Sequence, residues 1–106
     1  MEVYKLKDYT RGWFVGNFEP SVLKTDIFEV AIMTHKKGEV WDKHIHKIST
    51  EYNVLIDGEM TICGKKINQG DIFVINKNEI ADPVFIEDCK IVVLKVPSVP
   101  SDKYKI

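Results

Sequence analysis

The sequence has few of the features that define several large classes of protein. Among its 106 residues there are only two cysteines, and they form no CxxC pair. No apolar run approaches the roughly 20 residues that a membrane-spanning helix needs, and the first residues lack the apolar core of a signal peptide. Acidic and basic residues are interspersed, with a formal net charge of −1 and no basic block. We therefore expect a cytoplasmic protein without a nucleic-acid or membrane partner.

The two cysteines indicate no disulfide framework. Cys63 and Cys89 could pair, but free thiols are expected in a reducing compartment. Their spacing does not match a metal site, so we expect both to be small apolar residues on strands.

Short apolar runs separated by turn residues dominate the chain. Branched and aromatic residues recur with period two, and turn signals recur at intervals of about ten residues, which is typical of an antiparallel sandwich or barrel. In the first run Phe28, Val30 and Ile32 share one side, and Asp57-Gly58 predicts a two-residue hairpin. The expected strands are residues 27–33, 52–56, 59–63, 71–75, 83–86 and 90–96.

The two ends of the chain are less regular. Residues 1–26 contain aromatic residues and glycines, which predicts a loop or edge strand packed over one end of the barrel. Residues 97–106 contain two of the four prolines and predict an extended arm, either disordered or lying on a partner subunit.

One stretch carries residues suited to metal binding. His44 and His46 lie two apart, so on a strand they point to the same side. Glu51 follows a short polar break and can face the same interior. Two imidazoles and one carboxylate suit iron, manganese, zinc, nickel or copper. Alternatively, the histidines are a surface or core pair and Glu51 is a solvated strand charge.

The glycines that flank this stretch favour the metal interpretation. Gly38, His44, His46, Glu51 and Gly58 follow the pattern glycine, five residues, HxH, four residues, glutamate, six residues, glycine. This pattern resembles the first signature of the cupin superfamily. The resemblance implies an all-β, single-domain cupin over residues 1–106, an antiparallel double-stranded jelly-roll barrel with its core at about 27–96. It also implies a divalent metal ion on His44, His46 and Glu51.

The second cupin signature is incomplete. Counted from Gly70, the positions of its proline, glycine and histidine are taken by Asn76, Asn78 and Ala81. Asn78 can adopt the left-handed conformation that glycine supplies, but Ala81 cannot bind metal. Asp82 replaces the missing ligand only if the backbone slips by one residue.

Strand parity gives the expected pocket. The inward residues would be Asn53 and Leu55 with Glu51, Phe85 with Ala81, and Met33. For Leu55, Phe85 and Met33 the parity favours plain core over a place in the pocket. We expect His35 to be exposed and Trp41 to lie near the mouth, on the face opposite His44.

Three functions remain open. The first is a metal-dependent enzyme, an oxygenase or a sugar isomerase or epimerase, with Glu51 as the catalytic candidate. The second is a non-catalytic cupin that binds a sugar-like or carboxylate ligand, with or without metal, which the absence of a histidine at Ala81 favours. The third is a structural barrel with vestigial histidines. The resemblance also implies a homodimer, with Trp13, Phe14 and Phe18 as a contact surface unless they cap their own barrel.

Overall fold

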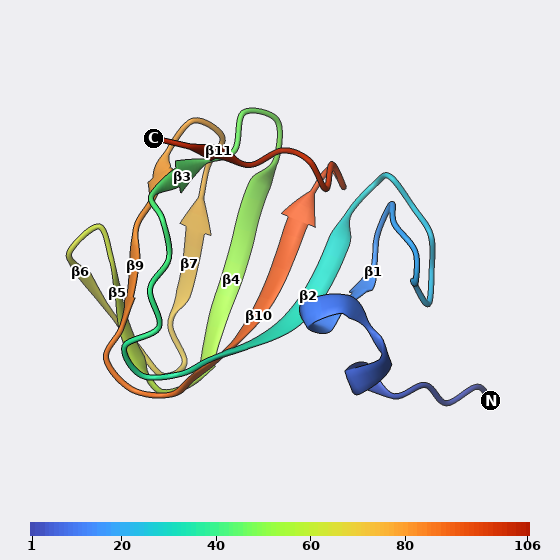
Figure 1. Ribbon diagram of the computed structural model, residues 1–106, viewed down its shortest axis with the longest axis horizontal. Helices are drawn as coiled ribbons and strands as arrows, with labels where there is room; N and C mark the ends of the chain where they lie inside the picture. The colour runs from blue at the N-terminus through green and yellow to red at the C-terminus, as the bar shows by residue number, and fades with distance from the viewer.

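The computed structural model describes all residues 1–106, and its regular structure is antiparallel β-sheet apart from two short 3₁₀ helices, η1 and η2 (Figure 1). A five-stranded sheet has the order β1-β2-β10-β4-β7, and two three-stranded sheets have the orders β11-β3-β8 and β6-β5-β9. No helix is long and apolar enough to cross a membrane. The elements are η1 (Leu6–Asp8), η2 (Thr10–Gly12), β1 (Trp13–Val15), β2 (Glu29–His35), β3 (His44–Ile45), β4 (Thr50–Asp57), β5 (Glu59–Ile62), β6 (Lys65–Asn68), β7 (Ile72–Ile75), β8 (Ile80–Ala81), β9 (Pro83–Phe85), β10 (Cys89–Val96) and β11 (Tyr104–Lys105).

The long strands β2, β10 and β4 form the centre of the five-stranded sheet. In one cross-strand row Val93 pairs with Ala31 and Asn53, and in the next Ile91 pairs with Met33 and Leu55. Alternate residues of these strands are buried, as period two requires. On β2 the fully buried side begins with Glu29 and Ala31, whereas Val30 and Ile32, which share the other side as predicted, are only half-buried.

The hairpin predicted at Asp57-Gly58 does not form. β4 pairs with β10 and β7, whereas β5 pairs with β6 and β9, so the chain turns a corner there from one sheet to another. Gly58 has φ 99°, and a Cβ at this position would lie 2.3 Å from the Asp88 carbonyl oxygen. Glycine is needed because the backbone of the β9–β10 connection passes directly against the corner.

The β5–β6 connection is a true hairpin, turned by Cys63 and Gly64 at φ 49° and 78°. Cys63 is therefore an exposed turn residue, and its predicted place on a strand is wrong. Cys89 is buried on β10, as expected, and both thiols are free.

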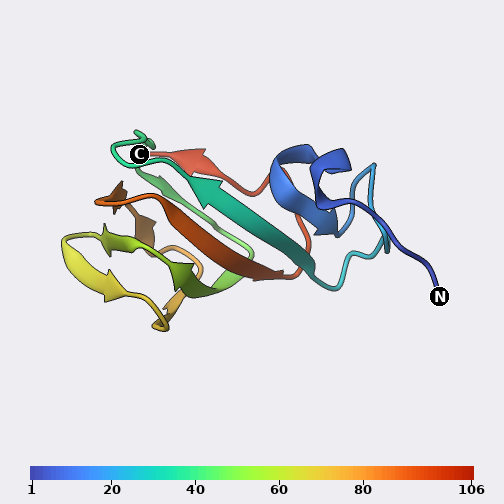
Figure 2. The ribbon, with the colours of Figure 1, turned by 90° about the horizontal axis from the view of Figure 1, so that it is seen from below.

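The N-terminal segment lies beside β2, at the end of the molecule opposite the β5–β6 hairpin (Figures 1 and 2). Its strand β1 pairs with β2 at the sheet edge, which agrees with the predicted edge strand.

The C-terminal residues cross the open end of the barrel and reach β3 (Figure 1). Tyr104 and Lys105 pair with Ile45 and His44, which makes β11 the partner of β3. The expectation of a disordered arm, or one lying on a partner, is therefore corrected: this segment completes the protein's own barrel.

Candidate functional site

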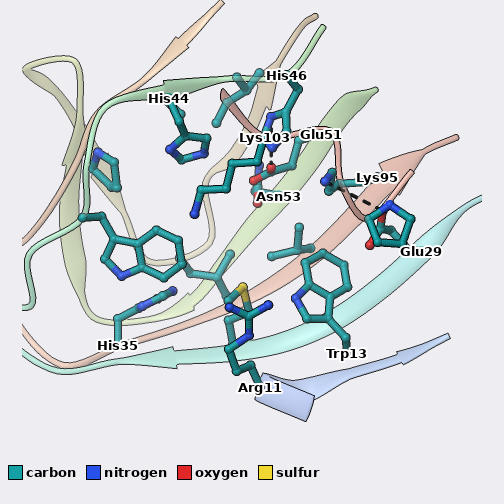
Figure 3. A pocket seen from close by; sticks show the side chains of 18 of the residues that line it. Arg11, Trp13, Glu29, His35, His44, His46, Glu51, Asn53, Lys95 and Lys103 are labelled. Carbon is teal, nitrogen blue, oxygen red and sulfur yellow. Dashed lines mark ion pairs between the residues drawn. The ribbon is translucent and has the colours of Figure 1, made fainter. Parts of the chain in front are cut away.

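A cavity of about 310 Å³ opens between the five-stranded sheet and the β11-β3-β8 sheet (Figure 3). Its lining combines apolar side chains with charged and imidazole side chains. The residues used below that line it are Arg11, Trp13, Phe18, Glu29, Met33, His35, Trp41, His44, His46, Glu51, Asn53, Phe73, Ala81, Pro83, Phe85, Lys95 and Lys103.

The two histidines enter the cavity from the same side, as their spacing predicts. His44 lies on β3 and His46 just after it, with ring centroids 5.1 Å apart and planes at 85°. The Nδ1 atom of His44 donates to the Asp42 carbonyl oxygen at 3.1 Å. This hydrogen bond fixes the tautomer, because the lone pair of a neutral ring is then on Nε2.

Glu51 reaches the same region from β4. One of its carboxylate oxygens, Oε2, lies 3.8 Å from Nδ1 of His46. That nitrogen is buried and has no hydrogen-bond partner, which is unusual for a buried polar atom. Asn53, two residues further along the same face, also lines the cavity.

Burial keeps both imidazoles neutral near pH 7. It lowers the pKa of His44, against the hydrogen bond to Asp42, with smaller lowering by the Lys103 and Lys95 charges. Burial followed by the Lys95 charge lowers the pKa of His46 to about 4. Burial raises the pKa of Glu51, although Lys95 and the Asn53 amide oppose the change. Neutral imidazoles have the lone pairs that metal ligands need.

A row of charged residues lies beside Glu51, and sequence reasoning did not identify it. Lys95 on β10 pairs in register with Glu29 on β2 and with Glu51 on β4. Lys95 Nζ lies 3.7 Å from Glu29 Oε1, and the two residues are only 6% and 3% exposed. The alternation of β10 could have identified Lys95 from the sequence, because Lys95 lies on the same side of the strand as the buried Ile91 and Val93.

The donors fit a divalent metal ion in kind. Two neutral imidazoles and a carboxylate line one cavity, and one imidazole nitrogen is buried without a partner. However, no three His, Cys, Asp or Glu side chains are grouped closely enough here to hold a metal ion. Binding would therefore require the three side chains to move closer to one another.

Residues 70–81, which match the second cupin signature only in part, form the expected turn but supply no metal ligand. Asn78 has φ 68°, as expected, and its N–H donates to the His46 carbonyl at 2.6 Å. Ala81 is the register partner of His44, so a histidine at 81 would lie beside the pair. Asp82 does not line the cavity, and its backbone carbonyl accepts a hydrogen bond from the Cys63 N–H.

The predicted positions of His35 and Trp41 are wrong. His35 is buried and lines the cavity, with its ring stacked on Phe85 at a centroid distance of 4.2 Å. Trp41 lies on the same cavity as His44, with ring centroids 6.4 Å apart, because residues 36–43 form a loop and strand parity does not apply there. Glu39 accepts hydrogen bonds from His35 Nδ1 and Trp41 Nε1, which holds both rings at the cavity.

Of the four residues predicted to line the pocket, three line the cavity and one does not. Asn53, Phe85 and Met33 line the cavity, whereas Leu55 is completely buried in the core cluster and does not reach it. Trp13 and Phe18 also line the cavity, and the homodimer with Trp13, Phe14 and Phe18 as its contact surface stays a prediction.

The connection between His46 and Glu51 is held by a residue of the C-terminal segment. The carboxylate of Asp102, which is 1% exposed, accepts hydrogen bonds from the N–H groups of Lys47, Ile48 and Ser49 at 2.8, 3.0 and 2.8 Å. Burial alone would raise the pKa of Asp102, but these three donors together lower it. Nothing local to residues 44–51 indicated this contact, because Asp102 is more than 50 residues away.

Comparisons with known proteins identify the fold. No family model matches the chain, and no curated protein matches it in sequence. Among solved structures, an uncharacterized conserved protein with a double-stranded beta-helix domain from Klebsiella pneumoniae has a TM-score of 0.69 at 16% identity, with 99% of this chain and 96% of that chain covered. A cupin-2 domain containing protein from Shewanella frigidimarina has a TM-score of 0.55 at 19% identity, with coverages of 71% and 76%.

The DMSP lyase DddQ from Ruegeria pomeroyi has a TM-score of 0.71 at 13% identity. The alignment covers 88% of this chain but only 49% of the lyase, so the chain spans about half the length of that protein. At such identities the matches establish the architecture, and function has to be argued from the site itself. They confirm the double-stranded β-helix expected from the sequence motif.

Proposed function

We propose that this chain, a small domain with the cupin fold, binds a small polar metabolite in its barrel beside a divalent metal ion held by His44, His46 and Glu51. One observation carries the proposal. Nδ1 of His46 is buried, lacks any hydrogen-bond partner and lies 3.8 Å from the Glu51 carboxylate, inside a cavity that His44 also lines. A metal ion on this nitrogen would satisfy a buried ring atom that has no hydrogen-bond partner in the protein.

A bound divalent ion would supply Lewis-acid chemistry toward a carbonyl, enediol or carboxylate oxygen of the ligand. The protein's own residues determine how that ligand lies. Apolar side chains of the lining, among them Phe73 and Phe85, would exclude water from the body of the ligand, and Asn53 offers an amide for orientation. A small-molecule site usually combines apolar surface with polar groups that fix orientation; here only 12 of the 25 lining residues are hydrophobic, which suits a polar ligand.

Glu29 is the group placed to move a proton if the site catalyses a reaction. It lines the cavity, is buried, and has one carboxylate oxygen, Oε1, without a hydrogen-bond partner. Burial raises the pKa of Glu29, partly offset by the Lys95 charge, and a raised pKa makes a carboxyl group better suited to exchange a proton with the ligand. Glu51 would be occupied as a metal ligand, so Glu29 replaces it as the acid–base candidate.

A second function, binding without turnover, is favoured by two specific features. Ala81 removes the histidine next to His44, and the Lys95 ammonium group lies in register with Glu51, where its charge opposes a cation. Such a domain would bind its sugar-like or carboxylate ligand for regulation or transport, with no metal.

Titration with Co²⁺, followed by visible absorption, tests the metal site. We expect one ion per chain in the wild type and none after His44→Ala/His46→Ala. Asp82→Asn is the matched control, because Asp82 lies outside the cavity and its loss should leave binding unchanged. Near-UV circular dichroism checks folding; if the double variant unfolds, His46→Gln and Glu51→Gln replace it. Saturable binding that survives these changes, or none in the wild type, rules out this site.

A further inference from the structure

Two cationic side chains from opposite ends of the chain point into the same cavity (Figure 3). Arg11 belongs to η2 near the N-terminus, and Lys103 directly precedes β11 near the C-terminus. Neither side chain forms an ion pair with any carboxylate, although seven other pairs are present in the structure. Two unpaired cations that face one cavity repel each other, so their convergence requires an explanation.

The surroundings of Lys103 show that this repulsion acts at the cavity. Partial burial lowers the pKa of Lys103 most, and the positive charges of Arg11 and Lys95 lower it further, against smaller effects of the Glu51 and Asp42 charges. Its Nζ lies 4.2 Å from the centre of the Trp41 ring, so an aromatic face holds the ammonium group where a carboxylate would be expected.

Both cations extend from backbone that is fixed in place. Arg11 has φ 50° and ψ 31°, a left-handed conformation that non-glycine residues rarely adopt. The next residue, Gly12, packs so closely against β2 that a Cβ there would lie 2.0 Å from the Ile32 carbonyl oxygen. On the other side, Lys103 follows Asp102, whose carboxylate is bound by three backbone N–H groups.

We propose that Arg11 and Lys103 together bind an anionic oxygen group, a carboxylate or phosphate, of the ligand that occupies this cavity. The guanidinium group of Arg11 offers two parallel donors and Lys103 adds a point charge, which is the usual chemistry for such groups. Trp13 and Trp41, which line the same cavity, would enclose the adjoining part of the ligand. This inference rests on the proposed function only for the ligand's place in the barrel, and it does not require the metal.

The two tryptophans of the chain provide the readout. The full chain, labelled with ¹⁵N, is titrated with matched acids and amides (benzoate and benzamide, glucuronate and glucuronamide) and with inorganic phosphate. Shifts of the two indole N–H signals, assigned with Trp13→Phe, report binding at the cavity. We expect at least one acid, or phosphate, to bind and the acid to bind at least tenfold more tightly than its amide. The acid and phosphate arms separate the two anionic groups.

Substitution then assigns the preference to these residues. Arg11→Gln and Lys103→Gln should each weaken acid or phosphate binding, and together they should remove the preference over the amide. Lys77→Gln, at an exposed lysine without an ion pair, is the control and should change nothing. Equal binding of acid and amide, no shift with any acid or phosphate, or unchanged anion binding in the double variant would overturn the proposal.

The same titrations with and without Co²⁺ separate this proposal from the metal site. If Co²⁺ does not bind but acids depend on Arg11 and Lys103, only the metal proposal fails. If Co²⁺ binds at His44, His46 and Glu51 but acids bind no better than amides, only the anion site fails.

Discussion

The two walls of the cavity are built in different ways. One wall consists of β2, β10 and β4, with 7, 8 and 8 residues, paired in register over most of their length. The other wall consists of β3, β8 and β11, with 2 residues each. The long-stranded wall positions Glu29, Lys95 and Glu51 through its ladder of backbone hydrogen bonds. The short-stranded wall positions His44 and His46 and depends on contacts from distant parts of the chain.

This difference shows where each half of the site derives its order. In a long ladder, hydrogen bonds to both neighbouring strands fix the position of each side chain. A two-residue strand fixes little, and here the Asp102 carboxylate and the Asn78 N–H supply the missing restraints. Substitutions in one wall or the other should therefore have different effects.

The largest loss is expected from the core of the long-stranded wall. Leu55→Ala removes a completely buried side chain and should lower the free energy of unfolding by about 4 kcal/mol. Ile56→Ala, at the exposed neighbour on the same strand, should lower it by less than about 1 kcal/mol. Urea denaturation measures both, and similar losses would mean that packing does not fix this wall.

The second largest loss of stability is expected in the charged row of Glu29, Lys95 and Glu51. Lys95→Met leaves Glu29 and Glu51 buried without their cation and should destabilise the protein by about 3 kcal/mol near neutral pH. Lys90→Met, at an exposed lysine on the same strand, is the control. Urea denaturation of the two variants should separate them clearly.

The loss in Lys95→Met should depend on pH. Burial raises the pKa of Glu29 and Lys95 opposes this, so removing Lys95 raises that pKa further. A carboxyl with a raised pKa in the folded state destabilises the protein progressively as pH rises from its ordinary value, 4.5, through the folded value. A difference between wild type and variant that is the same at pH 4 and pH 7 would contradict the ion-pair interpretation.

The third loss concerns the short-stranded wall. Asp102→Ala leaves three backbone N–H groups without their acceptor and should cost about 2 kcal/mol. Amide hydrogen exchange should accelerate at residues 47–49 before it does in β10. Asp71→Ala, which removes an exposed carboxylate bound to the single N–H of Asn68, is the control. Equal acceleration in β10 would show that Asp102 stabilises the whole barrel and not this connection.

Asp102→Asn gives the pH dependence of the same contact. Because the pKa of Asp102 is lowered in the folded state, its contribution is complete above the ordinary value of 3.8 and disappears as pH falls through the folded pKa. The stability advantage of the wild type over Asp102→Asn should therefore be constant from pH 5 to 7 and shrink in acid. A constant difference down to pH 2 would contradict this.

The smallest effect on stability is expected at Ala81. Ala81→His restores a ligand beside His44, in a buried position that faces the cavity, and should cost about 1 kcal/mol because a larger side chain has to be accommodated. Its effect should be on the metal, with Co²⁺ affinity raised at least tenfold. Asp82→His is the control, because residue 82 lies outside the cavity. Unchanged affinity in Ala81→His would mean that the histidine pair does not face the ion.

Sequence patterns predicted the parts of this site that lie on strands. Alternation correctly predicted that His44 and His46 share a side and that Ala81 and Phe85 face inward. The same rule failed at Trp41, which is on a loop. For Leu55 the rule predicted the buried face correctly, but the side chain lies in the core cluster and does not reach the cavity. The hairpin predicted at Asp57-Gly58 is a related failure, because a glycine with positive φ can turn the chain from one sheet to another as well as form a hairpin.

The sequence by itself determined the β-rich fold, the face on which each strand residue lies, and the pairing of two imidazoles with a glutamate, because these depend on period two and on short-range turn chemistry. Only the tertiary structure decided that Lys95 joins Glu29 to Glu51, that Asp102 holds the loop between His46 and Glu51, and that Arg11 and Lys103 meet over one cavity. Those contacts join residues far apart in the chain, and their geometry follows from how the sheets close on each other.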